Sequence, residues 1–322
     1  MSKLGISIAT LSGIPYADYV RLACEAEDAG FAAVMSPESN NDVLMCLHAV
    51  AKATSRIKLA SFIANVYYRE PVLCAAAAEM LQTESDGRFI LGLGSGPPQT
   101  LAGLGIERGN ARDRLRRYVE VIRRAHRGEP LAATGIRVRA PAMPVPIHFG
   151  ALVKETARLA GEIADGVMLY IAPPDRMRMM IDTTRAQAQR HGRTASDVSI
   201  TTGFPVFLAH DRKSGLEAAR RGLFFYVTLP FYNRVIARAG FEAEASAIAS
   251  ATSRGDLAGA GAAMSDRLVD WLAAAGSAEY CLERLAQYRA LEPDFVVIAP
   301  NPVGEDYPAA VRRAIKLFSP AK

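Results

Sequence analysis

Cysteine is scarce in this chain, and long apolar runs are missing. Four cysteines occur in 322 residues, at Cys24, Cys46, Cys74 and Cys281, far apart and without a CxxC pair. This spacing does not indicate a disulfide framework. No secretory leader precedes them, and no apolar run reaches the roughly 18 uncharged residues needed to cross a bilayer. We therefore expect buried thiols, no membrane contact and a cytoplasmic location.

The chain also lacks a block of like charges. Its 38 lysines and arginines and 33 acidic residues give a formal net charge of +5, with both signs interspersed along the sequence. Nucleic-acid-binding proteins usually concentrate basic residues in a patch or stripe, so we expect no nucleic-acid partner. A small positive surplus is compatible with an anionic cofactor or substrate.

Two common catalytic signatures are missing as well. The histidines have no paired spacing such as HExxH, and no serine stands in a GxSxG turn. We therefore exclude a metalloenzyme and a triad hydrolase, and we expect no metal ion. The five histidines are His48, His126, His148, His191 and His210.

Short β-type runs alternate with longer helical runs from the first residues onward, which predicts a parallel sheet with crossover helices. The expected strands are Leu4–Ala9, Phe31–Ser36, Ile57–Ile63, Arg88–Leu93, Ile147–Gly150, Val167–Tyr170, Val198–Ala209 and Phe295–Ala299. The expected helices are Tyr16–Ala29, Asp42–Ala53, Pro71–Glu84, Arg112–Arg127, Val153–Ala164, Arg176–His191 and Tyr307–Phe318. Eight such strands close a TIM barrel, (β/α)8. The fold class is therefore α/β, with residues 1–322 as a single domain around one large core.

Residues 211–275 are too long for a single crossover. The stretch is rich in alanine, and Gly255, Gly259 and Gly261 interrupt its helical segments. We interpret it as a helical insertion after the seventh strand. Loops after barrel strands lie at the catalytic face, so this insertion is placed to cover a substrate. A structural or subunit-contact appendage is the alternative.

Active sites of (β/α)8 barrels gather at the carboxyl ends of the strands, and several strand exits in this chain are unusual. After the second strand, the polar run SPESNND contains Ser36 and Glu38. A partly buried Glu38 could move a proton, whereas a solvated loop with helix caps is the alternative. After the third strand, Asn65 could hydrogen-bond the edge of a heteroaromatic ring or serve an ordinary turn.

The next two strand exits are rich in small residues. In GLGSGPPQT, Gly94 and Gly96 would let the backbone approach a flat ligand, with a generic glycine turn as the alternative. This run matches neither the dinucleotide fingerprint nor the P-loop. The fifth strand ends at Gly150–Leu152 before a helix, where free N–H groups and Lys154 could hold a phosphate. A solvated helix lysine is the alternative.

These stretches resemble the luciferase-like superfamily of flavin- and deazaflavin-dependent oxidoreductases over nearly the whole chain. The resemblance is carried by ATSRIKL at 53–59 with Asn65, Tyr67, Arg69 and Pro71, by GRFILGLG at 87–94, by PIHFGA at 146–151 and by LAGEIADGV at 159–167. Within the superfamily, the chain is similar to the methylenetetrahydromethanopterin reductases, which use coenzyme F420. That similarity lies in Asn40-Asn41, Asn65, the Gly94–Gly96 turn with Thr100, residues 104–107 and the closing segment 302–318.

The resemblance implies a deazaflavin stacked on a bulge of the third strand. A non-proline cis peptide is then expected at Phe62–Ile63, and the cofactor phosphate near Gly150–Leu152. The implied reaction is hydride transfer between reduced deazaflavin and a C=C or C=N bond of a small organic substrate. Glu38 is the catalytic candidate, and the implied cofactor-binding residues are Ser36, Ser61, Phe62, Ile63, Asn65, Gly94, Ser95, Gly96, Thr100, Gly150, Ala151, Leu152 and Met168.

Three positions depart from these relatives. Phe62 stands where the relatives tend to have glycine, so its ring could fill space that their cofactor or substrate occupies. Glu38 stands where they often have histidine. Pro97 stands where some deazaflavin dehydrogenases have an acidic residue, which leaves Glu38 as the remaining acid/base candidate. Glu38 would either handle the proton or orient the ring.

Two other functions stay open. The same fold could bind FMN and react with dioxygen as a monooxygenase, or it could be a barrel that has lost catalysis and only binds a ligand. The resemblance also implies a homodimer that acts on a small molecule.

Overall fold

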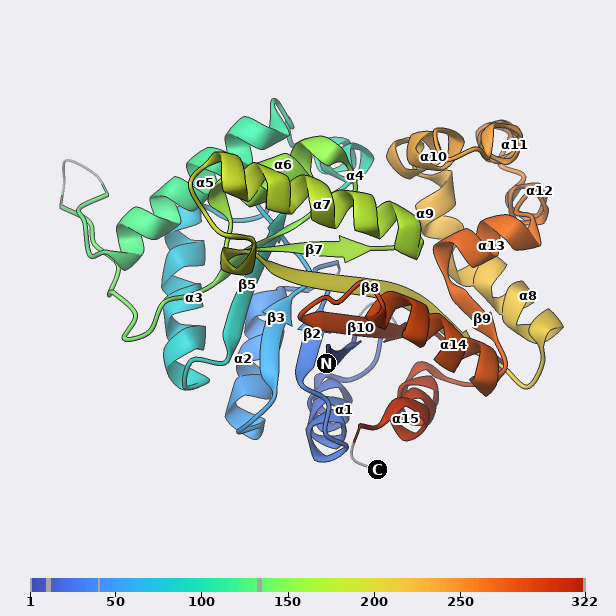
Figure 1. Ribbon diagram of the computed structural model, residues 1–322, viewed down its shortest axis with the longest axis horizontal. Coiled ribbons are helices and arrows are strands. Elements are labelled where there is room, and N and C mark those ends of the chain that lie inside the picture. Colours follow the sequence, from blue (N-terminus) through green and yellow to red (C-terminus); the bar gives the residue numbers. More distant parts are fainter. Residues whose placement is uncertain (1, 10–12, 40, 132–134, 321–322) are drawn as a thin grey trace.

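The structure is a closed barrel of eight parallel strands surrounded by helices (Figure 1). This computed structural model describes residues 2–9, 13–39, 41–131 and 135–320. Each strand pairs in parallel with the next, and β10 pairs with both β8 and β1, which closes the ring. The predicted α/β barrel is confirmed. Its strands are β1 (Lys3–Ser7), β2 (Ala33–Ser36), β3 (Lys58–Ser61), β5 (Phe89–Gly94), β6 (Ile147–Gly150), β7 (Gly166–Tyr170), β8 (Ser199–Leu208) and β10 (Phe295–Pro300).

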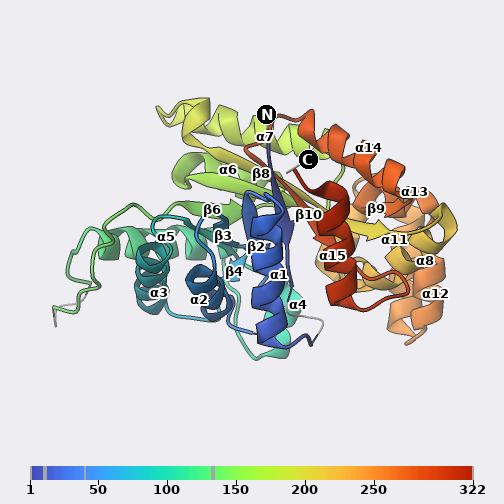
Figure 2. The ribbon, with the colours of Figure 1, turned by 90° about the horizontal axis from the view of Figure 1, so that it is seen from below.

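The crossover helices form where the sequence predicts them, with ends shifted by at most two residues. They are α1 (Tyr16–Asp28), α2 (Val43–Ala53), α3 (Pro71–Glu84), α5 (Ala111–His126), α6 (Lys154–Ile163), α7 (Pro174–Arg190) and α15 (Tyr307–Phe318). Two further helices, α4 (Pro98–Gly103) and α14 (Ala278–Arg289), are additional to the prediction. Helices α1 and α15 lie side by side where the ring closes (Figure 2).

Local signals in the sequence account for several helix starts. The Asp42 carboxylate accepts from the backbone N–H of Leu44 at 2.9 Å, and the Asn110 side chain accepts from the N–H of Arg112 at 3.1 Å. Pro71 occupies the first turn of α3. Such caps satisfy N–H groups that have no partner within the helix, so these helices begin where the chain provides them.

The barrel interior is filled by side chains. Met35, Ile90, Met168, Phe295 and Val297 form a small inner cluster, each at most 7% exposed. A larger apolar core lies between the strands and the surrounding helices. Because the interior is packed, a ligand of this barrel must bind above it, at the carboxyl ends of the strands.

The predicted helical insertion follows the seventh barrel strand, β8. In Figure 1 the arrowhead of β7 points toward it. The insertion has its own apolar core, which includes Leu223, Ile248 and Leu268. It ends in β9 (Ala274–Gly276), which pairs in parallel with β8. The helices of the insertion are α8 (Arg212–Gly222), α9 (Phe224–Thr228), α10 (Pro230–Ala237), α11 (Glu242–Ser253), α12 (Leu257–Ala262) and α13 (Asp266–Leu272).

Two expectations concern membrane segments and the cysteines. Among the described residues, no helix is both long and apolar enough to cross a membrane. The four cysteines are free thiols, and Cys46, Cys74 and Cys281 are buried while Cys24 is half-buried.

Candidate active site at the carboxyl end of the barrel

A bulge of the third barrel strand forms the floor of the candidate site. The strand β3 ends at Ser61, and the short strand β4 (Ala64–Asn65) then pairs with β5. The peptide bond between Phe62 and Ile63 is cis, which confirms the prediction. The backbone N–H of Phe62 donates to the carbonyl of Ser36 at 2.7 Å, so β2 holds the start of the bulge.

The side chain of Ile63 lies across the exits of β5 and β6. A Cβ atom added at Gly94 would lie 2.6 Å from Ile63 Cδ1, and one added at Gly150 would lie 2.9 Å from Ile63 Cγ2. Both distances are shorter than real Cβ contacts. In this structure the two glycines therefore make room for the bulge itself, not only for an external ligand.

Glu38 forms an ion pair at the base of the bulge. Its carboxylate accepts from both terminal nitrogens of Arg69 and, through Oε2, from the backbone N–H of Asn65 at 2.6 Å. The Glu38 side chain is 2% exposed and that of Arg69 is 13% exposed. Burial lowers the pKa of Arg69, but the hydrogen bond to Glu38 and the charges of Glu38 and Asp42 together outweigh burial, and the net pKa lies above its ordinary value. Both carboxylate oxygens are thus engaged within the protein.

Asn65 joins the bulge to the turn after β5. Its Oδ1 accepts from the N–H of Tyr67 at 3.0 Å, and a Cβ atom at Gly96 would lie 2.5 Å from its Nδ2. Gly96 also has φ +59°, which glycine adopts without strain. Ser95 accepts a hydrogen bond from Arg108 at 3.4 Å, and Thr100 lies in α4. The structure therefore brings Ile63, Asn65 and the Gly94–Gly96 turn together, and their contact with a cofactor stays a prediction.

Three predicted cofactor residues lie below this floor. Ser36 hydrogen-bonds the hydroxyl of Tyr19 at 2.7 Å, and Ser61 donates to the carbonyl of Gly92 at 2.8 Å. The sulfur of Met168 packs over Gly92. All three side chains are at most 2% exposed, so they support the bulge from beneath, and direct contact with a cofactor stays a prediction for them.

The exit of β6 carries the predicted phosphate-binding turn. The N–H of Ala151 donates to the carbonyl of Met168, whereas Lys154 is exposed at the start of α6. Arg176, which the sequence analysis did not single out, donates to the carbonyl of Leu152 at 3.1 Å. Burial lowers the pKa of its guanidinium, but a guanidinium stays charged at neutral pH. Two cations therefore flank this turn.

A row of aromatic rings connects the bulge to the insertion. The ring of Phe62 meets Tyr170 at the end of β7 edge to face, with centroids 5.5 Å apart. Tyr170 meets Tyr226 of α9 at 6.3 Å, and Tyr226 meets Tyr232 of α10 at 5.2 Å. Ile171, directly after Tyr170, has φ +56°, a backbone conformation that is strained for a β-branched residue.

The phenols of this row stay protonated at neutral pH. Burial, and then the neighbouring Tyr226, raises the pKa of Tyr170 well above its ordinary value. Burial also raises the pKa of Tyr226 and that of Tyr232. The sequence analysis did not predict these tyrosines as site residues. Two features of the sequence could have indicated them, however. Tyr170 ends a predicted strand, and Tyr226 and Tyr232 are aromatic residues within the predicted insertion.

Other residues with predicted roles lie at the edge of the site or outside it. Asn41 donates through Nδ2 to the sulfur of Cys46 at 3.3 Å. Asn40, which supports the resemblance to the reductases, lies outside the described residues. Pro97 is the N-cap of α4. Within the described chain, no cluster of three or more histidine, cysteine or acidic residues could hold a metal ion.

The fold and the bulge can now be compared with known proteins. The family profile of the luciferase-like monooxygenases matches residues 3–294. A 5,10-methylenetetrahydromethanopterin reductase from Archaeoglobus fulgidus is 27% identical over 302 residues, covering 89% of this chain and 90% of that protein. The structure of the coenzyme F420-dependent tetrahydromethanopterin reductase from Methanopyrus kandleri has a TM-score of 0.83 at 22% identity and covers 99% of this chain and 98% of that one.

A third similar structure is the oxygenating constituent of 3,6-diketocamphane monooxygenase of Pseudomonas putida, solved in complex with FMN. It has a TM-score of 0.69 at 18% identity and covers 100% of this chain and 98% of that one. The fold and the site together define a (β/α)8-barrel oxidoreductase. The chain belongs to the luciferase-like monooxygenase family.

Proposed function

We propose that this protein is a coenzyme F420-dependent oxidoreductase that transfers a hydride between the reduced deazaflavin and a C=C or C=N bond of a small organic substrate. The observation that carries the proposal is the floor made by Ile63 across the exits of β5 and β6, in a chain that aligns over most of its length with F420-dependent reductases. An immobile apolar floor suits a flat heteroaromatic ring that must present one face.

The residues around the floor fit such a ring. Ile63 would contact its face, and the side-chain amide of Asn65 can hydrogen-bond a polar ring edge. The turn at Gly150–Leu152, with Lys154 and Arg176 beside it, would hold the anionic part of the cofactor. When bound, the reduced deazaflavin supplies the hydride.

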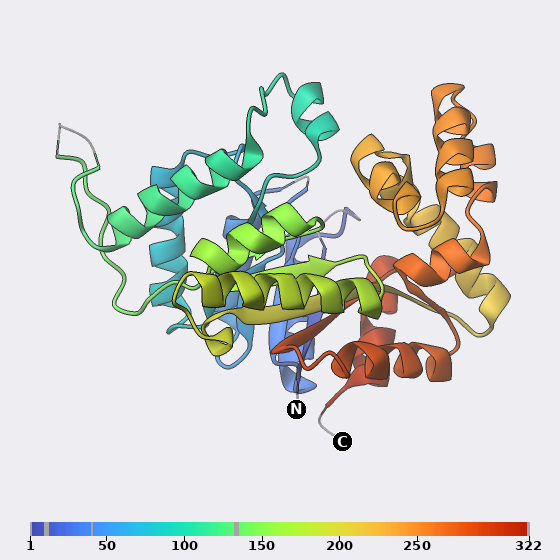
Figure 3. The ribbon, with the colours of Figure 1, turned by 45° about the horizontal axis from the view of Figure 1, so that its top comes forward.

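The insertion and the aromatic row would form the substrate side of the site. Figure 3 shows α4 and α5 (teal) on one side of the barrel and the insertion (gold to orange) on the other. Tyr170 and Tyr226 link the bulge to α9 and so exclude water from its neighbourhood. Reduction of a double bond adds a proton as well as the hydride, and these phenols are protonated donors at neutral pH.

Glu38 would act as a positioning residue. Its two oxygens hold Arg69 and the N–H of Asn65, so it fixes the backbone that carries Ile63 and Asn65. This geometry supports the orienting role over proton transfer.

The proposal is tested by titrating the purified protein with coenzyme F420 and, separately, with FMN while following the fluorescence of each. We expect saturable binding of F420 and no comparable binding of FMN. Failure to bind F420 would reject the proposal.

The FMN-dependent monooxygenase is the second candidate, because an FMN-bound monooxygenase has the same fold over the whole chain. Preferential binding of FMN, together with oxygen consumption that depends on reduced FMN and on substrate, would favour it. A deazaflavin has carbon in place of the flavin nitrogen at the reactive position and reacts poorly with dioxygen. Oxygen consumption therefore separates the two candidates.

A further inference from the structure

An open pocket rich in arginine lies beside the bulge. It has a volume of about 280 Å³. Three arginines line it and only one acidic side chain, Glu107, which is exposed. We call it the arginine pocket, and its lining residues are Tyr67, Ile106, Glu107, Arg108, Gly109, Asn110, Arg114 and Arg117.

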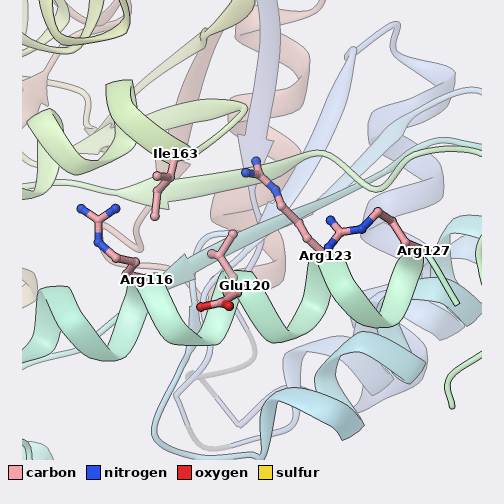
Figure 4. Close-up of a pocket in the computed structure, with 6 residues that line it drawn as sticks. Arg116, Glu120, Arg123, Arg127 and Ile163 are labelled. Carbon is pink, nitrogen blue, oxygen red and sulfur yellow. The ribbon is translucent and has the colours of Figure 1, made fainter. Parts of the chain in front are cut away.

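The three arginines have no acidic partner. Within the residues that the structure covers, Arg108, Arg114 and Arg117 form no ion pair, whereas other arginines of α5 do. Arg116 pairs with Glu162 at 2.7 Å and Arg123 with Asp165 at 3.2 Å. Figure 4 shows Arg116, Arg123 and Arg127 on the face of α5 that lies beside Ile163 of α6. On α5, Arg116 and Arg123 are therefore neutralised by acidic partners, whereas Arg114 and Arg117 line the pocket without an ion pair among the described residues.

Hydrogen bonds fix two of these arginines in place. The hydroxyl of Tyr67 donates to the carbonyl of Arg108 at 2.6 Å. Arg114 donates to the carbonyl of Val66 at 3.1 Å and stacks over the ring of Tyr67. Burial raises the pKa of Tyr67, and the charges of Arg108 and Arg114 oppose that rise. The pocket is thus preformed and positively charged.

One hydrogen-bond donor that lines the pocket has no acceptor in the described structure. The Nε of Arg108 is buried and has no hydrogen-bond partner in the described structure, although its Nη2 reaches Ser95 at the exit of β5. A buried guanidinium N–H without an acceptor is unfavourable. An oxygen-bearing anion in the pocket would satisfy it and would neutralise the positive charge.

We propose that the arginine pocket binds a carboxylate or phosphate group of a ligand whose reactive part lies on the Ile63 floor. Arg108 connects the pocket to Ser95, one residue beyond Gly94. One ligand can therefore reach both places. The anionic group belongs to the glutamate tail of the deazaflavin cofactor or to the substrate, and this choice of source rests on the proposed function.

The anion site itself is tested without any cofactor. Inorganic pyrophosphate should raise the melting temperature of the wild-type protein, and the rise should shrink in R117A and shrink further in R108A/R117A, to the part that the turn at Gly150–Leu152 contributes. The matched control is R116A, which removes a neutralised arginine from the same helix and should keep the full rise. An equal response of R116A and R108A/R117A would overturn the proposal.

The source of the anion is tested by comparing coenzyme F420 with the same deazaflavin lacking phosphate and glutamates. Tighter binding of F420, weakened about tenfold by R117A while the truncated ligand and R116A are unaffected, would assign the pocket to the cofactor tail. Binding of F420 that R117A leaves unchanged, with the pyrophosphate response of the wild type intact, would assign it to the substrate. Failure of both deazaflavins to bind would reject the proposed function, and the pyrophosphate result would still decide the pocket.

Discussion

The ion pair between Glu38 and Arg69 is the most consequential single-residue feature of the site. Arg69 also contacts Asp42 at 3.1 Å, and its carbonyl accepts from the hydroxyl of Tyr118 at 3.1 Å. The pair therefore connects the exits of β2 and β3 with α2 and α5. An ion pair of this kind is costly to break, because the remaining charge stays buried.

We predict that Glu38→Gln lowers the free energy of unfolding by roughly 3 kcal/mol, because Arg69 keeps its charge but loses its counter-ion. Cofactor affinity should fall, and the shape of the pH–rate profile should not change. Urea unfolding, a cofactor titration and the profile measure these effects. Glu84→Gln, which removes an exposed pair with Lys52, is the control. Loss of one limb of the profile would instead identify Glu38 as the acid or base.

His148 is a second buried titratable residue, on β6 and 3% exposed, with Nδ1 unpaired. Burial lowers its pKa to about 4 from the model-peptide value of 6.5, against the opposing charges of Asp165 and Asp294. Between these two values the unfolded chain binds a proton that the folded chain does not. His148 therefore leaves the free energy of unfolding unchanged above pH 6.5. As the pH drops from 6.5 toward 4, the free energy of unfolding falls by about 3 kcal/mol at most.

We predict that His148→Leu reduces the loss of stability between pH 7 and pH 4.5, measured by urea unfolding at each pH. The exposed His210, changed to leucine, is the control and should leave the pH dependence unaltered. An identical pH dependence in wild type and His148→Leu would contradict this assignment.

At the scale of secondary-structure elements, the bulge is held by the packing of one strand exit against two others. Ile63 follows β3, whereas Gly94 ends β5 and Gly150 ends β6. The three strands are consecutive neighbours in the barrel. A side chain at either glycine would push Ile63 away from its position, so the shape of the floor depends on all three elements.

We predict that Gly94→Ala costs roughly 1–3 kcal/mol of stability by overpacking and weakens cofactor binding. The double variant Gly94→Ala/Ile63→Ala should recover stability, because the colliding atoms are gone. Gly103→Ala in α4, where nothing lies within 4 Å of an added Cβ, should cost nothing. If Ile63→Ala gave no recovery, the contact between Ile63 and Gly94 would not be the cause.

At the scale of the whole molecule, two adjacent helices carry unusual exposed apolar side chains. Met45 of α2 is 63% exposed, and Leu73 and Met80 of α3 are 67% and 40% exposed. Helices α2 and α3 pack against each other. Clustered exposed apolar groups mark interaction surfaces, and a two-fold interface uses the same surface on both copies. We propose that these side chains take part in the interface of a homodimer.

We predict a homodimer in light scattering coupled to size exclusion, and a shift to monomer in Leu73→Lys. Leu257→Lys in the insertion changes a leucine that is 61% exposed and should leave the dimer intact. A wild-type monomer at all concentrations would reject the prediction.

Much of the architecture could be predicted from local patterns. Alternation of β-type and helical runs is sufficient for eight strands and their order, because a parallel strand needs a crossover helix to return. Capping residues such as Asp42 and Asn110 mark helix starts for the same local reason. The cis peptide at Phe62–Ile63 was accessible only through the resemblance to a family, since nothing in its composition indicates it.

The sequence by itself determined the barrel, the place of the insertion and the strand exits that form the site, because each depends on periodicity within a few turns of chain. Only the tertiary structure decided what those exits do. Glu38 meets Arg69 31 residues later, and Phe62 meets Tyr170, which in turn meets Tyr226. That Arg108 and Arg117 form no ion pair within the described residues likewise depends on where the carboxylates lie. Such contacts join residues far apart in sequence, and no local pattern records which partner the closed barrel will bring near.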